Sequence, residues 1–243
     1  MIATPAEQAR LLDLADLDTQ LDQLDHRRRT LPEHDEIAEL MAARQSVTEA
    51  LVAVNTALSD AEVAQERADD DLRPVKERLA RNQQRTEDGS VTDPKALRGL
   101  LDEIDHLKVR ISKLEDSQLE IMQVVEDAAA QQRQAQSNRD AVDVRLREVV
   151  AARDRQVGHV DDEIASRRAD RRGIVDELPA DLVALYEKIR ARSGLAAARL
   201  VEGRCTGCRL QLTSADLHRY AAARPDEVLR CVECDRILVR DEG

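Results

Sequence analysis

The sequence predicts a mainly α fold built on one long helical hairpin, with a small separate domain at the C-terminal end. Three observations support it: the composition, two seven-residue repeats, and a turn signal between them. Of the 243 residues, 35% are charged, none is Phe or Trp and only two are Tyr. A compact globule of this size normally buries several aromatic side chains. An apolar fraction made mostly of Ala, Leu and Val is instead typical of coiled coils, and it argues against most enzyme architectures.

The first arm is predicted by alternating steps of three and four residues from Ile37 to Leu79, where eleven of thirteen positions are apolar. A repeat this long indicates a supercoiled helix that requires a partner helix. The partner is a second repeat from Leu97 to Val149, which continues more weakly to Val160. Its seam is interrupted by three polar residues, Gln118, Gln132 and Arg139. We interpret these as residues that tune the register of the coil rather than bind a ligand.

The tip of the hairpin is predicted at residues 86–93, between the two repeats. Asp88-Gly89 is a turn dipeptide, and Asp93-Pro94 places an N-cap before a first-turn proline. A reversal here makes the two arms antiparallel, so the numbers of facing residues add to a constant. The seams align at a sum of 179, which pairs Leu72 with Leu107 and Leu79 with Leu100. A register one heptad away also aligns them.

Two prolines and a change of pattern subdivide the arms. Pro32 interrupts the first arm and predicts a kink or short loop near residues 30–34, whereas Pro74 lies inside the strong repeat and predicts a kink without a break. Near the C-terminal end of the second arm, Arg153 and Gln156 dilute the seam and predict weaker pairing. The coiled-coil hairpin is therefore assigned to residues 1–175.

The four cysteines form two C-x-x-C pairs separated by 22 residues: Cys205, Cys208, Cys231 and Cys234. Two residues between thiolates let one tight turn direct both sulfurs at a tetrahedral ion, and two such turns complete the coordination. This spacing predicts one structural Zn²⁺ with no open position for catalysis. A redox or labile disulfide pair and an iron–sulfur centre remain alternatives. His218 lies nearby in sequence and is interpreted as a surface or capping histidine, with alternative metal ligand as the competing role.

The segment from residue 176 to 243 is predicted as a zinc-ribbon domain. A short helix follows Pro179, a strand spans residues 195–201, and further strands follow each cysteine pair at 210–212 and 237–239. A capped helix is expected from Thr213 to Arg224. The complete fold class is mainly α: a long antiparallel coiled-coil helical hairpin, then a small C4 zinc ribbon with short strands and one or two short helices.

The charge balance bears on the choice of partner. The net charge is −12, and residues 201–243 hold seven basic and eight acidic side chains, so the surface as a whole repels phosphate and acidic membranes. Two basic clusters are nevertheless candidates for an anion or nucleic-acid contact. They comprise Arg27, Arg28 and Arg29, and Arg167, Arg168, Arg171 and Arg172. Solvated helix surface is the competing interpretation.

The chain resembles a family of bacterial proteins that carry a long antiparallel coiled-coil hairpin followed by a four-cysteine zinc ribbon. The matching stretches are Val91–Leu97 at the tip, Leu114–Met122 on the return arm, Leu178-Pro179 with Leu185-Tyr186, and the two cysteine motifs Cys205–Cys208 and Cys231–Leu238. Members of that family are adaptors and chaperones, some tied to flagellar or type III secretion proteins and some proposed to contact nucleic acid. The resemblance implies a binding scaffold with zinc ligands at the four cysteines.

The function predicted from these features is a non-enzymatic, zinc-binding, chaperone-like adaptor that binds a protein partner through its coiled coil and zinc ribbon. The alternative is a nucleic-acid-binding regulator that uses the ribbon and the basic clusters. No paired acid and base indicates catalysis, and we expect no small-molecule substrate. No segment approaches the roughly 18 consecutive apolar residues of a membrane span, and no signal-peptide pattern is present, so we expect no membrane partner and a cytoplasmic location.

Overall fold

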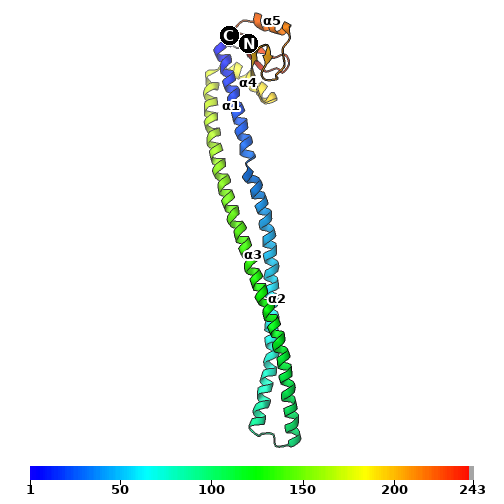
Figure 1. Ribbon diagram of the computed structural model, residues 1–243. Coiled ribbons are helices and arrows are strands. Elements are labelled where there is room, and N and C mark those ends of the chain that lie inside the picture. The colour runs from blue at the N-terminus through cyan, green and yellow to red at the C-terminus, as the bar shows by residue number, and fades with distance from the viewer. Residues whose placement is uncertain (241–243) are drawn as a thin grey trace. The chain divides into compact units, whose positions relative to one another are not determined.

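The structure is a computed structural model that describes residues 1–240, so the last three residues of the predicted zinc-ribbon domain lie outside the described part. The helices are α1 (Pro5–Arg29), α2 (Pro32–Glu87), α3 (Pro94–Glu177), α4 (Ala180–Ser193) and α5 (Ser214–Ala222). The strands are β1 (Ala197–Val201), β2 (Arg204–Cys205), β3 (Leu229–Arg230) and β4 (Ile237–Arg240). Two very long helices followed by a small strand-containing region confirm the predicted mainly α fold class (Figure 1).

Local side-chain chemistry sets where the long helices begin and end. The Thr4 hydroxyl caps α1, and Glu7 bonds back to the Thr4 amide at 2.6 Å in a capping box. Pro32 lacks the amide hydrogen that would join α1 to α2, and it occupies the first position of α2 instead. At the tip, Gly89 adopts φ +67°, and the Asp93 carboxylate accepts hydrogen bonds from the first turn of α3. By contrast, α2 runs through Pro74 unbroken.

Residues 35–150 form one compact unit, in which α2 and α3 lie antiparallel (Figure 1). Three side-chain contacts across the two helices fix their register: Asp69–Gln118, Asn55–Gln132 at 2.9 Å, and Arg44–Asp143 at 2.6 Å. The residue numbers of each pair add to 187.

The predicted sum of 179 is therefore wrong by about one heptad. In the observed register Leu72 lies at the level of Leu114, and Leu79 at the level of Leu107; these four pack with Val75 and Ile111 in one cluster. An apolar repeat looks the same after a seven-residue shift, so it does not determine the register. The polar pairs that flank it do.

The second compact unit joins the two ends of the chain, Met1–His34 and the residues from Ala151 onward. This grouping differs from the sequence-based division at 175/176, because α1 and the last part of α3 pack with the C-terminal elements. Its main core is formed by buried side chains of α1, α3, α4, β1 and β4. The largest are Leu11, Leu14, Leu182, Tyr186, Ile189 and Ile237, all at most 1% exposed.

The seam is diluted around Arg153 and Gln156 as expected, since none of residues 150–159 is buried, but the packing recovers directly beyond this stretch. Val160 is fully buried and Ile164 is 4% exposed, and both pack against Leu21 of α1. The dilution at Arg153 and Gln156 is followed by a well-packed segment, because α1 supplies an apolar stripe of its own opposite α3.

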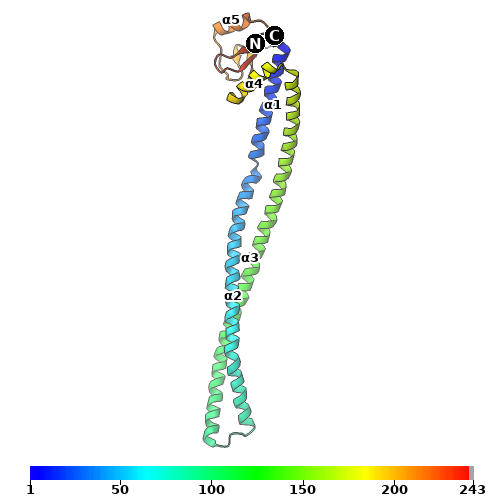
Figure 2. The ribbon, with the colours of Figure 1, turned by 180° about the vertical axis from the view of Figure 1, so that it is seen from behind.

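A four-stranded sheet with the order β2-β1-β4-β3 forms the ribbon. β1 and β4 are parallel, with Ala197 opposite Ile237, and the two outer strands are antiparallel to their neighbours. The strand expected at 210–212 is absent, since this segment forms only an isolated bridge between Gln211 and Arg204. Figure 2 shows α1, α4 and the ribbon gathered around the N-terminus. Within residues 1–240, no helix combines the length and apolar character needed to cross a membrane.

Candidate metal centre and the unit that supports it

Two turns of the same geometry present the four cysteine thiols. In the first, the amide of Arg209 donates to the carbonyl of Cys205 at 2.7 Å; in the second, the amide of Asp235 donates to the carbonyl of Cys231 at 2.9 Å. Arg209 and Asp235 both adopt a left-handed backbone, with φ near +64° and +65°. Each pair of cysteines thus lies in a tight turn, here called a knuckle, which spans Cys205–Arg209 or Cys231–Asp235. The left-handed residue at its end, Arg209 or Asp235, reverses the direction of the chain.

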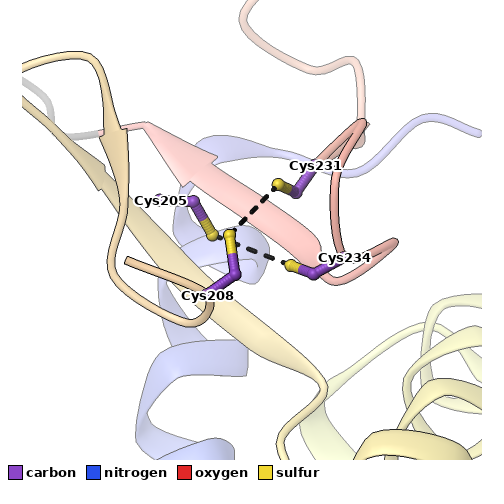
Figure 3. Close-up of side chains that lie close together, drawn as sticks. All are labelled: Cys205, Cys208, Cys231 and Cys234. Atoms are coloured by element: carbon purple, nitrogen blue, oxygen red, sulfur yellow. Dashed lines mark hydrogen bonds between the residues drawn. The ribbon is translucent and has the colours of Figure 1, made fainter. Parts of the chain in front are cut away.

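The four sulfur atoms lie within 4.8 Å of one another (Figure 3). Cys205 Sγ lies 3.9 Å from Cys234 Sγ, and Cys208 Sγ lies 3.9 Å from Cys231 Sγ. Four thiolates at about 2.3 Å from a tetrahedral zinc ion are separated from one another by about 3.8 Å. The observed separations fit this geometry, so the site can hold one zinc ion and leaves no position open for water or substrate.

The thiols do not share one electrostatic environment. Burial raises the pKa of Cys205 and raises that of Cys231 to about 12. Burial acts in the same direction on Cys234, but hydrogen bonds from the backbone and side chain of Arg236 outweigh it and lower the pKa to about 7. Zinc binds the deprotonated thiolates, so metal binding releases protons and should weaken as the pH falls.

Side chains of the ribbon pack around the knuckles and hold them in place. Cys205 and Cys231 are at most 2% exposed, in a core that also contains Leu212, Tyr220 and Leu238. The Tyr220 hydroxyl donates to the carbonyl of Arg230 at 2.9 Å, next to the second cysteine pair. The metal site therefore rests on a small apolar core of its own.

Two arginines tie the ribbon to its surroundings. Arg236 donates to the carbonyl of Leu195 at 2.9 Å, between α4 and β1. Arg240 donates to carbonyls at and beyond the end of α5, those of Tyr220, Ala223, Arg224 and Pro225. A cation at the C-terminus of a helix offsets the partial negative charge of the helix dipole. No sequence motif identifies either arginine in advance.

A buried carboxylate joins α1, α3 and α4 beneath the ribbon. Asp18 is 1% exposed and contacts three side chains: Arg171 at 2.7 Å, Arg190 at 3.1 Å and the hydroxyl of Tyr186 at 2.7 Å. Arg171 also pairs with Glu187. Burial disfavours the charge on Arg171, but its hydrogen bonds to Asp18 and Glu187 raise its pKa above the ordinary value.

The sequence gives one weak indication of this cluster, which the apolar repeat by itself does not reveal: a charged residue on the apolar stripe of α1. Asp18 follows the buried residues Leu11 and Leu14 and precedes Leu21 at helical spacing. A charged residue on an apolar stripe indicates a buried polar contact.

The predicted basic clusters both lie in this compact unit, and several of their members are engaged with carboxylates. Arg28 pairs with Asp161 at 2.8 Å, and Arg167 pairs with Asp170 at 3.2 Å, both at the surface. Arg171 belongs to the Asp18 cluster. The remaining members are exposed: Arg27, Arg29, Arg168 and Arg172. His218 is exposed on α5 and lies outside the group of ligand atoms that can hold a metal within residues 1–240.

Comparison with known proteins accounts for nearly the whole chain. Residues 14–194 match the model of the CT398-like coiled coil hairpin domain, and residues 204–238 match the C4-type zinc ribbon domain. A protein of Mycobacterium tuberculosis strain H37Rv is 32% identical over 243 residues, which cover 100% of this chain and 99% of that protein. A Mycobacterium leprae protein is 26% identical over 233 residues, 95% of this chain and 99% of its own length.

Solved structures extend the likeness to the fold. A Mycobacterium smegmatis protein superposes with a TM-score of 0.84 at 30% identity, covering 99% of this chain and all of that one. CT398 from Chlamydia trachomatis gives a TM-score of 0.63 at 13% identity, with 97% and 98% of the two chains covered. The latter identity is low, so it supports the fold alone. On these matches the chain belongs to the family of CT398-like coiled coil hairpin proteins, and its hairpin is followed by a C4-type zinc ribbon.

Proposed function

We propose that the protein is a non-enzymatic, chaperone-like adaptor whose zinc ribbon and adjoining helices bind a protein partner. The observation that carries this proposal is the exposure of two apolar side chains at the metal knuckles. Leu210 follows the first cysteine pair and is 50% exposed, and Val232 lies within the second pair and is 47% exposed. The knuckles are held by zinc and by the ribbon core, so these side chains are presented on a rigid support.

Rigid apolar side chains favour a protein partner because they bind at little cost in conformational entropy. The zinc site supports a structural rather than catalytic role, since four cysteines fill a tetrahedral coordination sphere. The Asp18 cluster and the core around Tyr186 join the ribbon to α1 and α3. A partner bound at the ribbon would therefore contact a support that does not need to fold on binding.

The experiment is capture of protein partners from a native lysate by the tagged full-length chain, with and without nuclease. Leu210→Asp combined with Val232→Asp should abolish capture, whereas Val124→Asp, at a site on α3 that is 56% exposed, should not. Zinc content and helical circular dichroism of each variant must match those of the wild type. Unchanged capture by the Leu210/Val232 variant would contradict the proposal.

The nucleic-acid-binding regulator is tested in the same assay. Replacing Arg27, Arg28, Arg167 and Arg168 with Ala removes charge without touching the Asp18 cluster. A nuclease-sensitive complex that weakens steeply with salt and disappears in this variant would favour the regulator. The pairing of Arg28 and Arg167 with carboxylates supports the adaptor instead, because these charges are already partly neutralised.

The position of the contact is tested by shortening the hairpin in register. Residues 58–71 and 116–129 are two heptads from each arm that lie opposite one another in the observed pairing. Their removal leaves the tip unchanged, and it does not alter the compact unit that the two ends of the chain form. Capture should survive, since the proposal assigns binding to the ribbon and its neighbouring helices and treats the distal hairpin as a spacer.

A further inference from the structure

The side chain of Arg236 is partly buried between the second knuckle and the end of α4. Its Nε donates to the carbonyl of Leu195 at 2.9 Å, and its Nη2 donates to the carbonyl of Ser193 at 3.4 Å. Its own carbonyl accepts from the amide of Cys231 at 2.9 Å, and its amide and side chain both donate to the sulfur of Cys234. Arg236 therefore joins the second knuckle to the end of α4.

The first knuckle lies against the stem of the same side chain at Gly207. A methyl group at this position would lie 2.8 Å from Cδ of Arg236 and 3.0 Å from Cβ of Ala198, both closer than ordinary van der Waals contact. Because Gly207 has no side chain, the knuckle can approach Arg236 this closely. The stem of Arg236 is thus enclosed by both knuckles and α4, which fixes where its charge lies.

The positive charge of Arg236 has no carboxylate partner within residues 1–240. The two oxygen atoms that its guanidinium contacts belong to neutral backbone carbonyls. Two nearby arginines differ in this respect, because Arg192 and Arg230 both pair with the carboxylate of Asp235. A partly buried guanidinium loses hydration, and without an opposite charge this loss is not compensated. The unpaired charge therefore indicates another anionic group close to Arg236.

The metal centre supplies this anionic partner. Four thiolates and one Zn²⁺ ion together carry a charge of about −2. The side chain of Arg236 donates a hydrogen bond to one of these sulfurs, that of Cys234. Hydrogen bonds to an ionised acceptor are roughly twice as strong as those between neutral groups, and such contacts orient the ligands of a metal. Arg236 and the loaded centre should therefore stabilise one another.

We propose that Arg236 is a positioning residue of the zinc site, which orients Cys234 and balances part of the negative charge of the four thiolates. Arg236 does not bind the metal itself, because it acts through the sulfur of Cys234. Its two hydrogen bonds to the end of α4 hold the guanidinium in place for this role. The same bonds make α4 part of the support of the metal site. This inference does not depend on the proposed adaptor function, because it concerns only the retention of zinc.

The first test is the zinc affinity of the full-length chain, measured at neutral pH by competition with a chromophoric chelator. Arg236→Gln keeps an amide donor but removes the charge, and it should weaken zinc binding about 10–100-fold, as is typical for outer-shell partners of metal ligands. Arg236→Lys keeps the charge and should recover a large part of this loss. An affinity of Arg236→Gln within about threefold of the wild type, or no recovery in Arg236→Lys, would overturn the proposal.

Arg192→Gln is the matched control. Arg192 also joins the end of α4 to the second knuckle, at 2.7 Å, but its partner is the carboxylate of Asp235 and not a sulfur. The loss of this exposed ion pair should change the zinc affinity by less than about fivefold. If Arg192→Gln weakened zinc binding as much as Arg236→Gln does, the effect would come from the link to α4 alone, and the role assigned to the charge of Arg236 would be contradicted.

The second test examines the thiolates directly, with Co²⁺ in place of Zn²⁺ in the full-length chain. Co²⁺ also binds in tetrahedral thiolate sites, and its thiolate-to-metal charge-transfer absorption reports on the electron density at the sulfurs. Loss of a hydrogen-bond donor raises this density, so the band of Arg236→Gln should move to longer wavelength, while that of Arg192→Gln should match the wild type. An unchanged band in Arg236→Gln would show that Arg236 does not act on the sulfur, and would refute the proposal.

Discussion

The hydroxyl of Tyr186 donates a 2.7 Å hydrogen bond to the carboxylate of Asp18, a residue 168 positions earlier in the chain. This bond joins α4 to α1, and with Arg171 and Arg190 it makes the polar centre of the unit that supports the metal site. Its energetic role can be measured directly.

Asp18→Ala should destabilise this unit by about 3–5 kcal/mol, because it removes the buried carboxylate that Arg171, Arg190 and Tyr186 share. Hydrogen exchange of the α1 and α4 amides, measured by mass spectrometry, reports on this unit separately from the hairpin. Asp22→Ala is the control, since Asp22 is largely exposed and lies 3.6 Å from Arg190; its effect should stay below about 1 kcal/mol. Equal effects would show that Asp18 has no special role.

The same hydrogen bond predicts a pH dependence at alkaline pH. Burial, together with the hydrogen bond to Asp18, raises the pKa of Tyr186 above its ordinary value. Above pH about 10 the unfolded tyrosine releases its proton while the folded one keeps it, so stability is lost as pH rises. Between pH 8 and 10.5 the melting temperature should fall more for the wild type than for Tyr186→Phe. Parallel curves would contradict this assignment.

Zinc removal should affect the two parts of the chain unequally. The purified protein should contain one zinc ion per chain by elemental analysis, and Cys231→Ser should abolish binding and unfold the ribbon. Limited proteolysis should then cut between residues 195 and 240, while far-ultraviolet circular dichroism stays strongly helical because α2 and α3 do not depend on the metal. A Ser variant with a protected ribbon would contradict the structural role.

The register of the hairpin predicts a specific disulfide. Cysteines at positions 79 and 107 should oxidise to an intramolecular bond, because these residues lie at the same level of the seam and pack in one cluster. Cysteines at 79 and 100 are the control, since they are paired only in the register one heptad away. Faster oxidation of the control pair would show that the helices pair in the register with the sum of 179 instead.

Asn82 is a buried polar residue in the same seam, 7% exposed, and its side-chain nitrogen has no hydrogen-bond partner. Asn82→Leu should raise the stability of the hairpin by about 1–2 kcal/mol, because it removes an unsatisfied buried group. The substitution should also weaken the selection of register. Denaturant unfolding measures the first effect, and the two disulfide pairs above, in the Asn82→Leu background, measure the second.

Several features of the fold follow from short-range rules and could be predicted from the sequence. The break at Pro32, the turn at Gly89 and the closeness of the two thiols within each C-x-x-C pair all depend on residues adjacent in the chain. The register could not be predicted, because it depends on side chains such as Asp69 and Gln118 that meet only after the helices pair. The same holds for Asp18, whose partners lie more than 150 residues away.

The N-terminal residues hydrogen-bond to the loop before β3: the amide of Ala3 donates to the carbonyl of Asp226, and the amide of Val228 donates to that of Met1. These bonds join the first residues of the sequence to residues more than 220 positions later, so they can form only after the ribbon has been synthesised. α1 is synthesised before the other described helices and strands, and the side chains of α4, β1 and β4 that pack with Leu11 and Leu14 follow well over 100 residues later. At about 5–20 residues per second, its apolar stripe waits on the order of ten seconds or more for its partner. During synthesis, the apolar stripe of α1 is therefore exposed to aggregation until the ribbon has been made.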